Sequence, residues 1–251
     1  MNFATTIVSV APLRKEALHS SEMISQLIFG ECVIITDATK DFYKIQSLFD
    51  NYEGWCSKKQ LQTIDESFCQ QNHTSVTTQP VTKVIHNHYQ MLLASGSFIG
   101  AVKNNILEIE NLKFIFQEND VKHKITDIKS LLFSYINVPY LWGGKTIFGI
   151  DCSGFVQQAY KMLGIVLHRD AYQQAEQGTA IGFLQEAKIG DLAFFDNKEN
   201  KITHVGILLN EAQIIHASGS VRIDTIDNAG IINSTTNERT HQLRLIKRIL
   251  S

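Results

Sequence analysis

The sequence of 251 residues predicts an α+β fold in its C-terminal half, preceded by one or two small all-β units. Three observations favour this fold class. Short segments rich in β-branched and aromatic residues follow one another in residues 1–62, separated by polar turns. Apolar residues after residue 121 recur at helical spacing. Three apolar strands are expected after those helices, and helices followed by an antiparallel sheet are typical of an α+β protein.

Composition and charge narrow the class of partner. Hydrophobic residues make up 44% of the chain and charged residues 19%, which favours a globular core over disorder. The net charge of −2 offers no polycation to bind nucleic acid or an anionic membrane. No stretch approaches the ~20 apolar residues of a membrane span. The first ten residues alternate polar with apolar and lack the basic region of a signal peptide, so we expect a cytoplasmic protein.

The glycines indicate two regions of different character, because only 4 of the 15 precede residue 121. In residues 1–62 we expect a small barrel with strands at Thr6–Val10, Glu31–Thr36, Phe42–Gln46 and Tyr52–Cys56.

Residues 63–120 are expected to form a linker and a second, weaker β unit. The polar run Gln70–Pro80 is the candidate linker. Strand signals follow at Met91–Leu93, Ile106–Ile109 and Lys113–Phe116.

Residues 121–251 are expected to form the α+β domain. Thr126 is placed to cap a helix that ends before Pro139. A second helix should begin at Cys152 with the apolar stripe Phe155, Val156, Ala159 and Leu163, and end near Gly164. A short helix over Ala171–Gln177, capped by Asp170, precedes strands at Leu192–Phe195, Ile202–Leu209 and Gln213–Ala217.

Cys152 is the first candidate for chemistry, because it stands at the expected start of a helix after a glycine-rich turn. The helix dipole and the free N–H groups at such a position favour an anion, and the thiolate is the nucleophilic form of cysteine. A small buried cysteine is the commoner alternative.

His204 and His216 lie in strands that are otherwise almost wholly apolar. Two such histidines on one hairpin suggest a relay in which His204 takes the thiol proton and His216 orients it. The two share a sheet face only if the loop between the strands has an odd number of residues, such as Asn210–Ala212. A two-residue turn would place them on opposite faces.

Five segments, in this order, carry a family resemblance: Pro139–Gly144, Gly149–Val156, Gly190–Phe195, His204–Ile207 and Ile215–Ser218. Together they resemble the NlpC/P60 peptidases over roughly residues 124–249. The resemblance implies a papain-like fold, a triad of Cys152, His204 and His216, and hydrolysis of peptidoglycan stem peptides.

The N-terminal segments Val10–Arg14, Gln26–Glu31 and Tyr52–Trp55 resemble the bacterial SH3-like domains of γ-D-glutamyl-L-diamino acid endopeptidases. There the SH3-like domain closes one end of the cleft and helps to recognise the free amine of an N-terminal L-Ala. The resemblance implies that role for Glu31 and Tyr52. An exposed loop glutamate and a barrel tyrosine are the alternative.

The same resemblance implies further substrate contacts. Asp151 matches an acid that binds the substrate amine, although it is also an ordinary N-cap, and Ser153 matches a group that holds the α-carboxylate of D-Glu. Arg169 is suited to a carboxylate and lies beside Asp170 at the expected cleft edge. Ala171 stands where many relatives carry serine, which removes one expected hydrogen bond.

Around the nucleophile, Tyr140 matches a tyrosine whose hydroxyl helps to hold the oxyanion, and Trp142 matches an aromatic lining of the cleft. The expected reaction is attack by the Cys152 thiolate on the γ-carbonyl, protonation of the leaving amine by His204, and hydrolysis of the thioester. No metal or organic cofactor is expected, and the expected form is a monomer.

Other readings stay open at this stage. A papain-like amidase or acyltransferase shares the triad chemistry, and a wall-binding module could retain the fold with little catalysis. His86 and His88 have the spacing of a metal pair, but a solvated loop is preferred because no third ligand is evident. The remaining thiols lack histidine companions and are expected to be inert: Cys32, Cys56 and Cys69.

Overall fold

The computed structural model describes residues 2–117, 125 and 127–250. The chain divides into two compact units, residues 1–125 together with 162–166, and residues 126–161 together with 167–251. The boundary expected after residue 120 lies outside the described residues. Within the described part, no helix is both long and apolar enough to cross a membrane.

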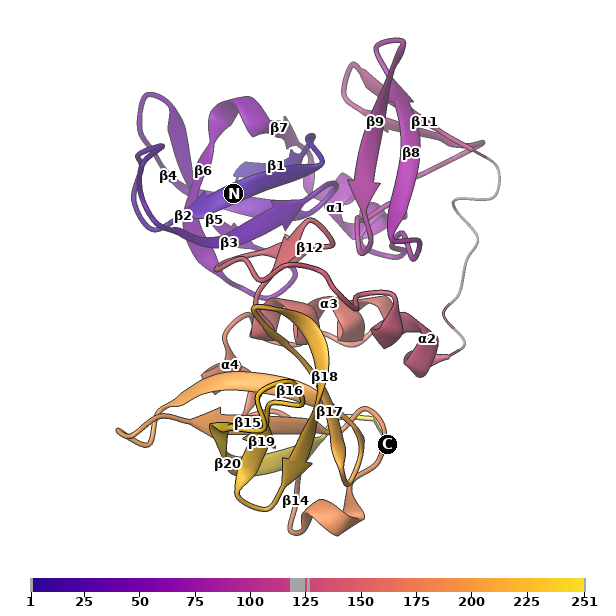
Figure 1. The fold of residues 1–251 in the computed structure, drawn as a ribbon. Helices are drawn as coiled ribbons and strands as arrows, with labels where there is room; N and C mark the ends of the chain where they lie inside the picture. The colour runs from indigo at the N-terminus through magenta and orange to yellow at the C-terminus, as the bar shows by residue number, and fades with distance from the viewer. Residues whose placement is uncertain (1, 118–124, 126, 251) are drawn as a thin grey trace. The chain divides into compact units, whose positions relative to one another are not determined.

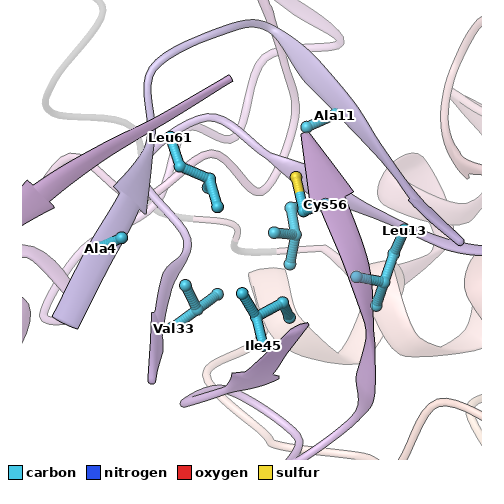
Figure 2. Packing of buried hydrophobic residues seen from close by; sticks show 8 residues of the cluster. Ala4, Ala11, Leu13, Val33, Ile45, Cys56 and Leu61 are labelled. Atoms are coloured by element: carbon cyan, nitrogen blue, oxygen red, sulfur yellow. The ribbon is translucent and has the colours of Figure 1, made fainter. Parts of the chain in front are cut away.

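The first unit begins with a curved antiparallel sheet of seven strands (Figure 1). The strands are β1 (Asn2–Thr6), β2 (Val10–Arg14), β3 (Met23–Ile28), β4 (Cys32–Ala38), β5 (Phe42–Ser47), β6 (Glu53–Ser57) and β7 (Leu61–Ile64), with the 3-10 turn η1 (Lys58–Gln60) before β7. Their order is β3-β2-β6-β5-β4-β1-β7. Figure 2 shows the core of this barrel, where alternate strand residues such as Leu13, Val33 and Ile45 meet.

The prediction of a strand at Thr6–Val10 is wrong. The structure ends β1 at Thr6 and begins β2 at Val10. The chain changes neighbours between them, because β1 pairs with β4 and β7 whereas β2 pairs with β3 and β6. Apolar alternation continues through this corner, so the sequence pattern alone does not reveal the break.

A helix and a second sheet complete the first unit. Helix α1 (Glu66–Asn72) includes the start of the expected linker, and the buried Asn72 amide donates to the carbonyls of Gly30 (2.9 Å) and Phe98 (3.3 Å). The second sheet has the order β10-β11-β8-β9. Its strands are β8 (Val81–His86), β9 (Tyr89–Ala94), β10 (Ile106–Ile109) and β11 (Leu112–Phe116). Phe29 of the barrel lies in the same hydrophobic core as Phe114 of this sheet.

The second unit starts with helices. Asp127 is the N-cap of α2 (Ile128–Phe133), and its carboxylate accepts from the N–H groups of Lys129 (3.0 Å) and Ser130 (3.1 Å). The expected cap, Thr126, lies outside the described residues. The remaining helical elements are α3 (Cys152–Met162), α4 (Ala171–Gln174) and the 3-10 turn η2 (Leu184–Glu186), and a two-stranded ladder of β12 (Lys145–Thr146) and β13 (Gly149–Ile150) precedes α3.

Helix α4 ends earlier than expected, at Gln174 instead of Gln177. The Gln177 side chain instead accepts from the His168 N–H (2.9 Å), which closes the loop around the helix. Gly164 has a φ of +80°, the left-handed conformation expected of a residue that follows a helix end.

A seven-stranded antiparallel sheet forms the rest of the second unit, in the order β14-β20-β15-β16-β17-β18-β19 (Figure 1). The strands are β14 (Thr179–Ile181), β15 (Leu192–Asp196), β16 (Ile202–Asn210), β17 (Gln213–Ser218), β18 (Ser220–Asp227), β19 (Gly230–Ile232) and β20 (Arg239–Arg248). β19 also pairs with β20, so the sheet curls back on itself. This curvature brings β20 to the same region as β16 and β17, where the histidines lie.

Candidate active site

Cys152 is the first residue of α3 and is 7% exposed. Burial, and then the negative charge of the neighbouring Asp151, raise the pKa of the thiol to about 12. Backbone N–H groups of Val205 and Ser153 and the Arg169 charge act in the opposite direction. The N–H group of Ser153 at the helix start favours the thiolate, but desolvation outweighs it and keeps the thiol protonated. The thiol needs a base.

The backbone near Cys152 requires close packing. A Cβ at Gly154 would overlap the carbonyl oxygen of Gly144 and approach Asp151 Oδ1 to 2.9 Å. Only glycine permits this contact between the first turn of α3 and the preceding loop. The Gly154 N–H also donates to Asp151 Oδ1 (2.7 Å), which fixes the start of the helix.

His204 on β16 is the candidate base. Val205, the next residue, carries one of the N–H groups that act on the Cys152 thiol, so the strand brings this part of β16 to the nucleophile. Burial, and then His216 and His241, lower the pKa of His204 well below its usual value. His204 is therefore a neutral imidazole that can accept a proton.

His216 on β17 contacts His204 directly. His204 Nε2 lies 2.8 Å from His216 Nδ1. The two rings share a sheet face although the loop between the strands has only two residues, Glu211 and Ala212. A β-bulge between Leu208 and Asn210 supplies the extra residue that the loop lacks. The odd residue count that a shared face requires is therefore met by the bulge within the strand and not by the loop.

Gly206 permits this arrangement. A Cβ there would lie 2.8 Å from the Cβ of His216 on the neighbouring strand. It would also lie 2.7 Å from Ile214 Cδ1, so a side chain at position 206 would push against the strand that carries His216.

Asp224 on β18 extends the relay and was not among the predicted site residues. His216 Nε2 lies 3.0 Å from Asp224 Oδ2. The other carboxylate oxygen, Oδ1, accepts from Arg222 Nε (3.2 Å) and Nη2 (3.0 Å) and from the Ser234 N–H (2.9 Å). Burial opposes ionisation, but the hydrogen bonds from His216 and Ser234 and the Arg222 charge lower the pKa of Asp224 to about 2.

The ionised Asp224 fixes the tautomers of both histidines. Because a carboxylate only accepts, His216 Nε2 carries the proton and His216 Nδ1 accepts from His204 Nε2–H. His204 Nδ1 is then the ring nitrogen with a free lone pair, the state required to take the Cys152 proton. The sequence holds one signal for Asp224. Arg222 and Asp224 are charged residues two positions apart in the strand that follows His216, so their side chains share a face of that strand.

A third histidine, His241 on β20, was also missed. Its ring stacks on that of His204, with centroids 4.1 Å apart and an angle of 25° between the planes. Burial, and then His216, lower the pKa of His241 to about 4, against the effect of Asp224. His241 is therefore neutral at pH 7.

Tyr140 lies close enough to Cys152 for their charges to interact. Burial, and then Cys152 and Asp151, raise the pKa of the Tyr140 hydroxyl to about 12, so it remains a hydrogen-bond donor. Its backbone N–H donates to the Gly219 carbonyl (2.9 Å), which anchors the segment to the strand end after His216. Trp142, expected to line the cleft, is 58% exposed.

Asp151, Ser153 and Arg169, expected to contact substrate, form one buried cluster. Arg169 Nη1 and Nη2 donate to the two carboxylate oxygens of Asp151 (3.0 and 2.5 Å), and Nη1 also donates to Ser153 Oγ (2.9 Å). Arg169 is 1% exposed. Replacing either Asp151 or Arg169 would leave the charge of the other residue buried without its partner, which destabilises the fold. Asp170, the next residue, is the N-cap of α4, and its N–H donates to Gln173 Oε1 (3.4 Å).

Glu31 and Tyr52 belong to the first unit. Glu31 is fully buried, not an exposed loop residue, and its Oε2 accepts from the Ile28 N–H (3.1 Å). Tyr52 packs against the barrel core, and its N–H donates to Asp50 Oδ1 (3.1 Å). Their role in amine recognition stays a prediction.

The histidine pair His86 and His88, for which a solvated loop is preferred to a metal site, lies at a hairpin turn. His86 stacks on Phe114, with ring centroids 4.4 Å apart, and His88 has a positive φ in the hairpin turn. Across the described residues, no group of three or more His, Cys, Asp or Glu side chains is placed to hold a metal ion.

A cysteine at a helix start, with the backbone of the strand that carries His204 acting on its thiol, and a His-His-Asp relay on the same sheet are typical of a papain-like cysteine hydrolase. Residues 137–240 match the NlpC/P60 family, and residues 13–61 match the bacterial dipeptidyl-peptidase SH3 domain. The chain belongs to the NlpC/P60 family of cysteine peptidases.

Three relatives illustrate the family relation. The chain is 29% identical over 215 residues to a γ-D-glutamyl-L-lysine dipeptidyl-peptidase of Bacillus subtilis, covering 77% of this chain and 71% of the relative. It is 33% identical over 173 residues to the murein DD-endopeptidase MepS/murein LD-carboxypeptidase of Escherichia coli, covering 68% and 78%. An NlpC/P60 family protein of Bacillus cereus has the same fold, with a TM-score of 0.83 at 20% identity, covering 99% of this chain and all of the other.

Proposed function

We propose that this protein hydrolyses the γ-D-glutamyl–L-diamino acid bond of peptidoglycan-derived peptides that carry a free N-terminal L-Ala. The relay from Asp224 through His216 to His204 supports this proposal most directly, because it prepares a neutral base for a protonated thiol. The bond is suggested by the names of two relatives, the γ-D-glutamyl-L-lysine dipeptidyl-peptidases of Bacillus subtilis and Bacillus cereus. Such peptides arise when the wall is degraded, so the activity belongs to their recycling.

The reaction begins with proton transfer from the Cys152 thiol to His204 Nδ1. The thiolate then attacks the γ-carbonyl carbon, and the C=O electron pair moves to the oxygen. Tyr140 O–H and the N–H groups at the start of α3 are the donors available to that oxyanion. The N–H groups are part of the helix backbone, so they stabilise the developing charge without reorganising.

The intermediate collapses as the imidazolium of His204 protonates the departing amine of the diamino acid. This leaves a thioester between Cys152 and the γ-acyl group, and water activated by His204 hydrolyses it. The positive charge on His204 forms in a buried site, and Asp224 balances it through His216. Asp224 is in turn held by Arg222, so the carboxylate cannot turn away from the relay.

Recognition of the amine is the second part of the proposal. A charged amine requires carboxylate partners, for which Glu31 and Asp151 are the candidates. Asp151 is paired with Arg169, and Glu31 Oε2 accepts from the Ile28 N–H. We change Glu31 because changing Asp151 would leave the buried Arg169 charge unpaired. Blocking the amine removes its charge and adds bulk.

The test compares L-Ala-γ-D-Glu-L-Lys and L-Ala-γ-D-Glu-meso-diaminopimelate with their N-acetylated forms. We expect L-Ala-D-Glu and the free diamino acid as the only products by mass spectrometry. Acetylation should lower kcat/KM by about a hundredfold or more, which corresponds to losing one or two charge-assisted hydrogen bonds at roughly 1.5–3 kcal/mol each. Cleavage at another bond would contradict the proposed activity.

Glu31→Gln tests the amine site within the same assay. It should weaken cleavage of the free-amine peptide and barely change the slow cleavage of the acetylated one. Glu53→Gln is the matched control, because Glu53 lies on the same barrel in an exposed pair with Lys44 (3.6 Å). Equal rates on free and acetylated peptides would show that the N-terminal unit does not select for the amine.

A further inference from the structure

His241 contacts the candidate base face to face. The ring centroids of His241 and His204 are 4.1 Å apart with planes inclined by 25°, whereas His241 meets His216 edge-on at 5.8 Å and 89°. The backbone fixes this position, because His241 pairs with Ile231 of β19 and the next pair along β20 joins Gln242 to Asp196 of β15. The proton relay of Asp224, His216 and His204 does not include this third ring.

The His204 ring needs more than one contact to stay in its productive plane. The terminal torsion of a histidine side chain is broad, so the rotamer does not fix the ring plane. The hydrogen bond to His216 restrains one ring atom, Nε2. Phe195 touches the ring at a tilt of 48° with centroids 5.7 Å apart, and it does not stack on the ring. Of the ring contacts around His204 in the described structure, only that of His241 lies against the flat face.

We infer that His241 is a positioning residue, whose ring stacks on His204 and holds the plane of the imidazole so that Nδ1 faces the Cys152 thiol. The inference rests on the proposed role of His204 as the base. Small errors in the placement of a catalytic group have large effects on rate, because the reacting atoms must be aligned at contact distance.

The contact acts through the ring and does not relay a proton. His241 Nδ1 is hydrogen-bonded to Thr240 Oγ1 (2.8 Å), and the contact with His204 is between ring faces. His241 is also uncharged at neutral pH, because burial lowers its pKa to about 4, so it does not repel an imidazolium on His204. A neutral aromatic face instead attracts a cation that forms beside it. An aromatic ring without nitrogen should therefore replace it.

The experiment compares His241→Ala with His241→Phe in the full chain. The first readout is the rate at which iodoacetamide alkylates Cys152, measured by mass spectrometry of the Cys152 peptide, and the second is kcat and KM on the free-amine tripeptide. His241→Ala should slow alkylation and lower kcat by about tenfold or more, with KM within about threefold. His241→Phe should restore both to within about threefold of the wild type.

His86→Ala is the matched control, because it removes another stacked imidazole, the one on Phe114 in the first unit. It should leave both readouts unchanged. Wild-type rates in both His241 variants, or an equal loss in both, would overturn the inference. The alkylation assay needs no substrate, so absence of peptide cleavage by the wild type would contradict the proposed function and still leave the inference tested.

Discussion

Replacing Asp224 by asparagine should disable the base without changing its shape. Oδ1 of Asp224 accepts from three N–H donors, two on Arg222 and one on Ser234, so the amide oxygen of asparagine must occupy that position. The amide NH2 then faces His216 Nε2, which must become an acceptor. The proton moves to His216 Nδ1, the His204 tautomer reverses, and His204 Nδ1 already carries a proton when the thiol needs to release one.

The magnitude follows from the bonds that the productive tautomer would lose. In Asp224→Asn, the tautomer with the proton on His216 Nε2 would lose one charge-assisted hydrogen bond, worth roughly 1.5–3 kcal/mol. It would also leave that buried N–H without an acceptor, which costs roughly 1–3 kcal/mol. The sum of roughly 2.5–6 kcal/mol corresponds to a decrease in kcat of about 10²–10⁴. KM should change little, because Asp224 acts through the histidines.

The assay is steady-state cleavage of the free-amine tripeptide, together with the thermal unfolding midpoint of each variant. Asp227→Asn is the matched control, because Asp227 lies on the same strand and also pairs with an arginine, Arg239, but its side chain is 46% exposed. It should keep kcat within about threefold. A folded Asp224→Asn protein with kcat within threefold of the wild type would refute the tautomer argument.

The histidines give two further predictions. His204→Ala should lower kcat more than His216→Gln, because the base transfers the proton whereas its partner orients it; equal and negligible losses would make both histidines packing residues. Burial lowers the pKa of His204 in the folded state, so below about pH 6.5 the unfolded chain binds a proton at this residue that the folded chain does not bind. The free energy of unfolding should therefore fall as the pH drops below about 6.5. Denaturant titrations from pH 7 to 5 should show a contribution of up to about 1.4 kcal/mol per pH unit that His204→Gln abolishes, and an unchanged pH dependence in that variant would contradict the assignment.

The sequence contains enough information to place the reacting groups on their elements. A glycine-rich turn before an apolar helical stripe places Cys152 at a helix start, and isolated histidines in apolar strands mark His204 and His216. These features are local, because helical and strand periodicity act over a few residues. The family resemblance adds the order of the motifs, and the N-terminal barrel follows from its short strands.

The remainder of the site depends on long-range geometry. A bulge at Leu209 changes the residue count between the histidines, and nothing in the residue types marks it. His241 reaches His204 only because β20 joins β15 and β19, and β20 has no apolar alternation strong enough to identify it, since few of its residues are buried. The thiol pKa likewise depends on burial in the folded chain, which the position at a helix start does not reveal.

The nucleophilic role of Cys152 is tested most directly by trapping the thioester. The free-amine tripeptide is mixed with the protein, quenched in acid within the first turnovers, and digested for mass spectrometry. We expect an added L-Ala-γ-D-Glu acyl group on the peptide that contains Cys152, and no adduct and no turnover in Cys152→Ala. Turnover should be normal in Cys56→Ser, whose thiol lies in the barrel core. Turnover that persists in Cys152→Ala, or an acyl group on another residue, would contradict the nucleophilic role.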